Sequence, residues 1–228
     1  MRKIAFLRAS LMMISATLFA SPASAQISVS QLIVELNTEN SAADLEVVND
    51  SGERAYVTVT PRQIQLPGTP AESSFSTPNP ETLGLLVSPS RLILEPNQRR
   101  RLRIARVGAS SDHEKIYRVT VKPVTGEIEA TQSGIKMLVG YDLLVISRPV
   151  SSAVDLKKER TGSTLTIRND GASSVELVEG KLCLPTKVCS SIPGRRIYAG
   201  AIWSQPIPPT GTGEFRVKSM SGWSTLKF

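Results

Sequence analysis

Along most of the chain, apolar residues recur in short runs separated by polar and turn-forming residues, and helical spacing is almost absent. Runs of this length, bounded by Gly, Pro, Asn and Asp at close intervals, are typical of the strands of a β-sandwich. The Pro-, Ser- and Thr-rich residues 67–80 predict a long surface loop. The pattern predicts strands at residues 27–36, 43–48, 55–65, 85–87, 91–94, 99–105, 115–124 and 135–146.

A second group of runs follows residue 148 and predicts a second, smaller β-domain. The segment Arg148-Pro149-Val150-Ser151-Ser152 has the composition of a linker between domains. Strands are expected beyond it at residues 163–168, 175–182, 201–204 and 214–219, with a turn at residues 169–171. We therefore expect an all-β protein with two domains, at residues 26–148 and 149–228.

Residues 1–25 have a different character from the rest of the chain. Three basic residues near the start precede an apolar stretch, and Ala23 and Ala25 fit the small-residue rule for cleavage before Gln26. A membrane anchor is the alternative, but the apolar stretch is short for a span and small residues follow it at once. We expect a cleaved signal peptide and an exported protein without stable membrane insertion.

The charge of the chain gives only a weak argument for a nucleic-acid partner. Without the three basic residues of the leader, the formal net charge falls from +7 to +4. On a strand, Arg99, Arg101 and Arg103 share one face, whereas Arg100 lies with Leu102 and Ile104 on the other. Aromatic residues make up 5% of the chain and do not interleave with these arginines, so we expect a solvated sheet face and no nucleic acid.

Cys183 and Cys189 are the two cysteines of the sequence. In an exported protein, two cysteines this close together predict one disulfide, which would stabilise the fold by about 2 kcal/mol. A zinc site needs four ligands, and the one histidine, His113, cannot complete such a set. We expect no metal and no cofactor.

Catalytic signatures are missing from the sequence. It contains no Gly-x-Ser-x-Gly, no His-Glu-x-x-His and no glycine loop of the kind that binds phosphate. His113 lies in a polar stretch, which predicts a solvated loop residue and no member of a catalytic triad. We expect a protein that is not an enzyme.

The longest run, at residues 135–146, spans twelve residues, against about five or six in an average strand. A strand longer than its own sheet requires can pair with another chain, although the pattern alone fits an ordinary core strand better. One face is apolar and carries Ile135, Met137, Val139, Tyr141 and Leu143. The opposite face carries Lys136, Leu138, Gly140, Asp142 and Leu144.

Several landmarks follow one another in a fixed order: Leu-Glu-Val-Val-Asn-Asp at 45–50, Ser-Pro-x-Arg-x-x-Leu-Glu-Pro at 88–96, the arginine-rich run 99–104, Glu-Lys-Ile-Tyr-Arg-Val at 114–119, and Arg-Pro at 148–149. In order and spacing they resemble the PapD-like periplasmic chaperones of the chaperone–usher pilus pathway, over nearly all of the mature chain. The cysteine pair and the run at 114–119 are similar to the alternate, or class 5, branch, which serves colonisation-factor-type pili.

This resemblance implies two immunoglobulin-like domains in a boomerang arrangement and a periplasmic chaperone of pilus subunits. The long strand would complete the unfinished sandwich of a pilin by donor-strand complementation. Ile135, Met137 and Val139 would then enter the pilin core, and the chaperone would deliver the pilin to an outer-membrane usher. The free chaperone could cap its own edge by dimerising. A secreted immunoglobulin-like structural subunit or adhesin is the alternative.

The resemblance also carries over charged positions. Two cations that hold the pilin carboxylate in familiar members fall here at Ile33 and Leu144, and neither residue is charged. Glu114 and Arg148 match two members of an interdomain charge network, whose third member, an acid, falls at Gly222. The candidate substitutes for the missing cations are Arg118, Lys122 and Lys136.

Overall fold

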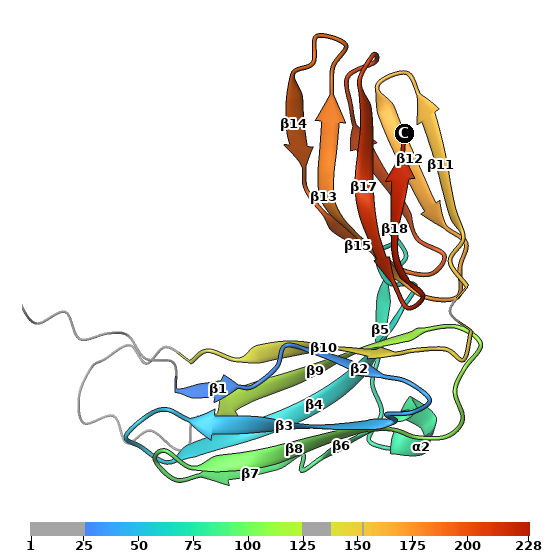
Figure 1. Cartoon of the computed structure of the whole chain (residues 1–228). Helices are drawn as coiled ribbons and strands as arrows, with labels where there is room; N and C mark the ends of the chain where they lie inside the picture. The colour runs from blue at the N-terminus through green and yellow to red at the C-terminus, as the bar shows by residue number, and fades with distance from the viewer. Residues whose placement is uncertain (1–25, 125–137, 152) are drawn as a thin grey trace, which may run out of the picture.

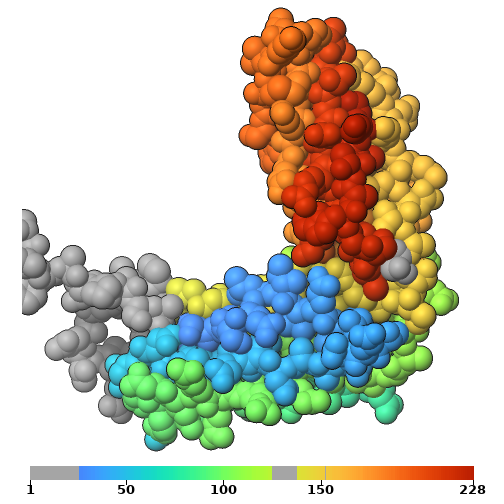
Figure 2. All heavy atoms as spheres, in the orientation of Figure 1, coloured from blue at the N-terminus to red at the C-terminus, as the bar shows by residue number. Residues whose placement is uncertain are grey.

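The computed structural model describes residues 26–124, 138–151 and 153–228. These residues form two β-sandwiches that extend in different directions from an elbow, and they contain a single short helix, α2 (Pro80–Leu83) (Figure 1). The space-filling view shows the sandwiches as two bodies that meet at the elbow (Figure 2), and each has its own buried core. The predicted all-β fold with two sandwiches is therefore confirmed. The expected leader, together with Ile135, Lys136 and Met137, lies outside the described residues.

The first sandwich consists of two sheets. Its strands are β1 (Ile27–Val29), β2 (Ile33–Leu36), β3 (Ala42–Asn49), β4 (Ala55–Gln65), β5 (Ser73–Phe75), β6 (Leu85–Ser88), β7 (Arg91–Leu94), β8 (Arg99–Arg106), β9 (Lys115–Val124) and β10 (Tyr141–Ser147). One sheet has the order β1-β3-β8-β6 and the other the order β2-β10-β9-β4-β5, with β7 also paired to β4. The predicted loop at residues 67–80 thus contains a short strand, β5, and leads into α2.

The second sandwich is smaller. Its strands are β11 (Leu156–Thr161), β12 (Thr164–Asn169), β13 (Val175–Cys183), β14 (Cys189–Ile192), β15 (Arg195–Ile197), β16 (Ile202–Pro206), β17 (Thr212–Ser219) and β18 (Gly222–Lys227). The sheets have the orders β11-β12-β16 and β14-β13-β17-β18, and β15 also pairs with β13. Cys183 and Cys189 face each other across the β13–β14 ladder and form the predicted disulfide.

The first predicted strand, residues 27–36, is divided between the two sheets. β1 pairs with β3, whereas β2 pairs in parallel with β10 in the opposite sheet. Ser30 ends the first ladder, because its backbone N–H donates to the Glu46 carbonyl at 3.0 Å and its hydroxyl accepts from the Glu46 N–H at 2.9 Å. Val34 and Leu36 then return to the same core from the other side.

The arginine-rich strand β8 has the expected arrangement of faces. Leu102 and Ile104 are fully buried, and the arginines at 99, 101 and 103 are exposed on the opposite face. There they lie beside acids on β3: Arg103 is 3.2 Å from Asp44. Arg100, which was expected on the face of Leu102, is exposed as well, because it is at the start of the strand. These side chains form a solvated, partly neutralised surface.

Each sandwich contains the same asparagine corner. Asn49, at the end of β3, is fully buried, and its amide nitrogen donates to the carbonyls of Glu53 at 2.6 Å and Leu94 at 3.0 Å. Its side-chain oxygen accepts from the Ser51 N–H at 3.0 Å. Asn169, at the end of β12, is also fully buried and bonds in the corresponding way to the residues two and four positions ahead and to a facing strand. The two corners fix equivalent turns in the two sandwiches.

Candidate functional site

The edge of β10 is only partly covered. On one side, β9 pairs with the whole strand, from Tyr141 to Ser147. On the other side, the ladder with β2 begins at Leu144 and ends at Ser147. In the described part of the chain, no strand pairs with this second side of residues 141–143. This edge can therefore accept a further strand.

The orientation of the backbone groups follows from the bonds to β2. The N–H of Leu144 donates to the Leu32 carbonyl at 2.9 Å, and the N–H of Arg148 donates to the Leu36 carbonyl at 2.7 Å. Because backbone groups alternate along a strand, Asp142 presents its N–H and C=O on the same side, beyond the point where β2 begins. The open edge thus continues the line of the β2 ladder.

The side chains of the predicted donor strand have different environments in this structure. Leu143 is fully buried in the core of the first sandwich, and Tyr141 packs against that core, with its hydroxyl donating to the Ile27 carbonyl at 3.0 Å. These two side chains therefore serve the sandwich of this chain. Val139 is 43% exposed. The two remaining apolar residues of the predicted face lie outside the described residues.

The strand itself is shorter than the predicted run in the part that the structure describes. β10 begins at Tyr141, and residues 138–140 belong to no strand. Gly140 nevertheless lies against β9, since a side-chain carbon at this position would be 3.2 Å from the Val121 carbonyl oxygen. Residues 138–140 therefore follow β9 closely without completing a ladder.

Ile33 and Leu144, where the resemblance places two cations, are direct partners in the parallel β2–β10 ladder. Ile33 is 49% exposed and Leu144 is buried. Leu144 belongs to a small apolar cluster with Ile116 and Ile146, and Tyr198 of the second sandwich packs against this cluster. The floor of the site at the elbow is therefore apolar.

Two arginines continue the same row across the sheet. Arg118 on β9 is the partner of Leu144, and Arg62 on β4 is the partner of Arg118. Arg62 binds Asp142 through both carboxylate oxygens, at 2.8 and 3.0 Å, and the Thr120 hydroxyl donates to the same carboxylate at 2.9 Å. One carboxylate thus lies between two guanidinium groups.

Arg118 has the weaker contact with this carboxylate. Its Nε is 3.9 Å from Asp142 Oδ2, and its Nη1 donates to the Asp142 carbonyl at 3.4 Å. Burial raises the pKa of Tyr198, and the positive charges of Arg118 and Arg196 oppose that rise, so Arg118 lies near the second sandwich. Because Asp142 binds Arg62 more closely, Arg118 retains the greater part of its positive charge. Lys122, four residues further along β9, is exposed.

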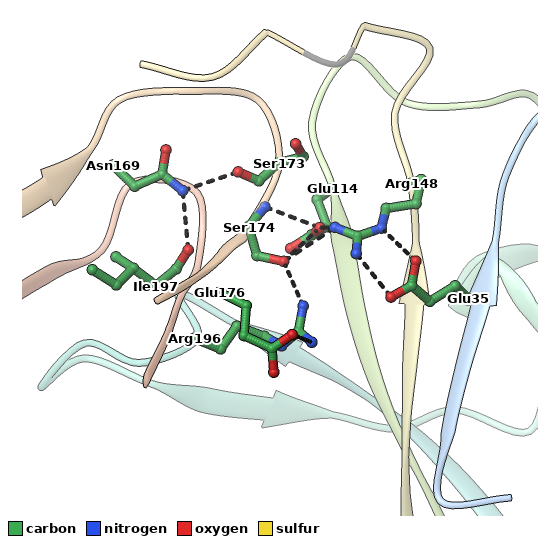
Figure 3. A network of polar contacts seen from close by, with 9 residues as sticks. All are labelled: Glu35, Glu114, Arg148, Asn169, Ser173, Ser174, Glu176, Arg196 and Ile197. Atoms are coloured by element: carbon green, nitrogen blue, oxygen red, sulfur yellow. Dashed lines mark hydrogen bonds and ion pairs between the residues drawn. The ribbon is translucent and has the colours of Figure 1, made fainter. Parts of the chain in front are cut away.

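Arg148 is at the centre of a polar network in the elbow (Figure 3). It is buried, and its Nη1 donates to Glu114 Oε2 at 2.6 Å and to the Ser174 hydroxyl at 3.2 Å. Its Nη2 and Nε donate to the two carboxylate oxygens of Glu35 at 2.9 and 3.2 Å. Arg148 therefore connects β2, the residue before β9, and the second sandwich.

Glu114 joins the two sandwiches through the turn that follows Asn169. The backbone N–H and the hydroxyl of Ser174 both donate to Glu114 Oε2 at 3.0 Å. The Glu114 N–H donates to the Ala172 carbonyl at 2.9 Å. In the second sandwich, the neutral Ser174 thus contributes to the network where the resemblance led us to look for an acid at Gly222.

Sequence reasoning anticipated Glu114 and Arg148 but missed Glu35 and Ser174. Glu35 is the one charged residue in the run Ile33-Val34-Glu35-Leu36. An acid at an exposed position between two buried residues is a weak signal that a cation lies nearby. Ser174 carries no comparable signal, because its role depends on the fold of the turn after Asn169.

Metal and membrane chemistry find no support in the ranges that the structure describes. They contain no group of three or more His, Cys, Asp and Glu side chains placed to hold a metal ion. The solitary His113 is exposed. No helix in those ranges is long and apolar enough to cross a membrane.

The family model for pili and flagellar-assembly chaperones, PapD N-terminal domain, matches residues 26–153, which is more than half of the chain. The chain therefore belongs to the PapD-type family of pilus-assembly chaperones, which is a chaperone family and not a class of enzymes. The matched residues include the whole first sandwich and the elbow arginine.

Individual relatives agree with this assignment. One of the CS1 fimbrial proteins of Escherichia coli is 22% identical over 190 residues, which cover 78% of this chain and 79% of that protein. The crystal structure of the class 5 fimbriae chaperone CfaA aligns with a TM-score of 0.68 at 19% identity, covering 88% of this chain and 98% of CfaA. A chain of the Salmonella enterica SafA pilin–SafB chaperone complex aligns with a TM-score of 0.62 at 20% identity, with coverage of 91% and 98%. These structures show the same fold.

Proposed function

We propose that this protein is a periplasmic chaperone that binds pilus subunits by donor-strand complementation and delivers them to an outer-membrane usher. The open edge of β10 at residues 141–143 supports this proposal most directly. An extended segment of a pilin can add to that edge by β-strand addition, the mode of pairing in chaperone–pilin complexes. The same edge makes the free protein prone to self-association, which a capping dimer would suppress.

Side chains beyond the edge supply the apolar contact. Val139 is exposed and has the same parity along the strand as the core residue Leu143. By alternation, Ile135 and Met137 belong to this face, which continues the core of the first sandwich past its end. We infer that these three side chains enter the groove of the pilin. Their burial would contribute about 5 to 9 kcal/mol before the cost of ordering the segment is subtracted.

Arg118 is the best-placed cation for a terminal carboxylate of the pilin. It lies in the same row as Ile33 and Leu144, at the elbow end of the open edge, and its charge is only partly neutralised. Lys122 is exposed on the same face but lies ~13 Å further along β9. Lys136 stays a third candidate, outside the described residues.

The second surface of the proposal is an exposed apolar row at the far end of the first sandwich. Ile93 on β7, Tyr56 on β4 and Val124 on β9 are successive partners across one sheet, and all three are exposed. Contiguous exposed apolar residues mark protein–protein contacts. This row is separate from the open edge of β10, so an usher could bind there while a pilin is held.

The alternative function is that of a secreted structural subunit or adhesin. Such a protein would present a ligand pocket and would have no need of an open edge beside an apolar strand. The open edge of β10 therefore favours the chaperone.

A charge on the proposed donor face tests the chaperone function. We expect Met137→Glu to fold normally, because this residue is beyond the described core, and to lose capture of a co-expressed cognate pilin. Val188→Glu is the matched control, because Val188 is 64% exposed on the second sandwich, away from the β10 edge. Undiminished pilin capture by Met137→Glu would contradict the proposal.

A further inference from the structure

Glu35 is a member of the elbow network that comes from neither β9 nor the second sandwich. It lies on β2, which covers the edge of β10 from Leu144 onwards. Its carboxylate accepts two hydrogen bonds side by side from Arg148, which follows the end of β10 (Figure 3). This contact therefore joins the side chains of two paired segments at the end of their ladder.

β2 is short for a strand that must keep a single alignment. It has four residues, in a parallel ladder, which is slightly less stable per residue than an antiparallel one. Val34 and Leu36 are buried, so a shift by one residue is excluded by the core. A shift by two residues keeps the same face buried and is the alignment error that needs a further barrier.

The contact between Glu35 and Arg148 supplies that barrier. A shift of two residues displaces the carboxylate by ~7 Å, which breaks both hydrogen bonds to Arg148. Arg148 cannot follow, because its Nη1 is bound to Glu114 at 2.6 Å and to Ser174 at 3.2 Å. Glu35 is thus bound to a guanidinium whose position is fixed from the other side.

The alignment of β2 determines where the open edge of β10 ends. In the observed alignment, Leu144 is the first residue of the β2 ladder and residues 141–143 are open. We infer that Glu35 is a positioning residue for pilin binding: through Arg148 it holds β2 in register and thereby fixes the end of the edge that a pilin strand can occupy. This inference rests on the proposed donor-strand function.

Glu35→Gln tests the role with little change of shape. Glutamine offers one acceptor oxygen, and its NH₂ group would face a second donor of Arg148. The contacts of Arg148 with Glu114 and Ser174 stay in place, so the elbow should be kept. Glu39→Gln is the control, because Glu39 is exposed four residues further on and the change removes the same charge.

Hydrogen exchange measured by NMR on the whole mature chain reports the register directly. We expect the amides of Leu144 and Arg148, which donate to carbonyls at the two ends of the β2 segment, to exchange about tenfold faster in Glu35→Gln. The Glu114 amide, which donates to Ala172 across the elbow, should be unchanged. Glu39→Gln should leave all three at the wild-type rate.

The rate of pilin dissociation distinguishes a positioning role from a purely structural one. We expect a co-purified pilin to dissociate about five- to tenfold faster from Glu35→Gln than from Glu39→Gln, because the end of its pairing edge is no longer fixed. Unchanged exchange, or faster exchange with unchanged dissociation, would overturn the inference while Met137→Glu still abolishes capture. If Met137→Glu captures pilin normally, the donor-strand function fails first and the inference falls with it.

Discussion

Ile33 and Leu144 are paired neighbours in the parallel ladder between β2 and β10. The resemblance to pilus chaperones places a pair of cations at these two positions, and the structure brings the positions together but gives them apolar side chains. The charge of the site is displaced by one strand, to Arg118, which is the partner of Leu144 on its other side. A pilin terminus that binds here would meet an apolar floor beside a guanidinium group.

Replacing Arg118 by Met should weaken pilin binding while leaving the fold intact. The change removes the cation nearest to Leu144 and keeps the apolar stem of the side chain. A charge-assisted hydrogen bond contributes about 1.5 to 3 kcal/mol, so we expect affinity to fall by about ten- to a hundredfold. Binding of purified pilin in low and high salt is the measurement, since a lost ionic contact also lowers the salt dependence.

Lys122→Met is the control for Arg118→Met. It removes a cation from the same strand and face, four residues or ~13 Å further from the elbow. A larger loss for Lys122→Met than for Arg118→Met would assign the carboxylate contact to Lys122.

Arg148→Ala should change the relative orientation of the two sandwiches. It leaves Glu114 and Glu35 without their shared cation, and Glu114 has a side chain that is only 1% exposed. Loss of one partner from a buried ion pair costs about 3 to 5 kcal/mol. Small-angle scattering should show a broader range of shapes, whereas far-ultraviolet circular dichroism should change little.

Arg216→Ala provides the comparison for Arg148→Ala. The ion pair of Arg216 with Glu179 is exposed on both sides, and an exposed pair contributes about 0 to 1 kcal/mol. Equal scattering curves for Arg148→Ala and the wild-type protein would show that the network does not determine the orientation.

Tyr117 should make the fold sensitive to alkaline pH. Burial raises the pKa of its hydroxyl to about 12, with a smaller opposing effect of Arg106. Since the folded state holds the proton more tightly than the unfolded state, stability is complete below pH ~10 and is lost as the pH rises from ~10 towards 12. Urea unfolding at several pH values should show this decline, on the order of 2 kcal/mol.

Tyr117→Phe removes the ionising group from the same buried position. Its stability should stay close to that of the wild-type protein near neutral pH and should decline less between pH ~10 and 12. Identical declines in the two proteins would assign the alkaline sensitivity to other groups.

Strands with one buried face could be predicted from the sequence, and fully exposed edge strands could not. β3 and β8 alternate between buried and exposed positions over their central residues, because one face of each packs in the core. β11 and β18, which were not predicted, are edge strands whose residues are nearly all exposed. Their pairing depends on the neighbouring strand and leaves no apolar period in the sequence.

The site shows the same division between local and distant causes. The apolar pattern of residues 135–146 is local and was visible, and the resemblance gave the pair Glu114 and Arg148. The break between β1 and β2 was not visible, because it depends on hydrogen bonds between Ser30 and Glu46, sixteen residues apart. Glu35 was missed for the same reason: its cation belongs to a segment 113 residues away.

The two asparagine corners should have different effects when they are removed. Asn49→Ala and Asn169→Ala each leave buried backbone carbonyls without a donor, which should lower the free energy of unfolding by about 1 to 3 kcal/mol. The Asn169 corner also holds the Ser173 carbonyl at 2.9 Å, directly before Ser174. Because Ser174 binds both Glu114 and Arg148, only Asn169→Ala should also loosen the elbow. Scattering on the two variants, at matched stability in urea, separates the effects, and equal elbow flexibility in both would show that the corner does not position Ser174.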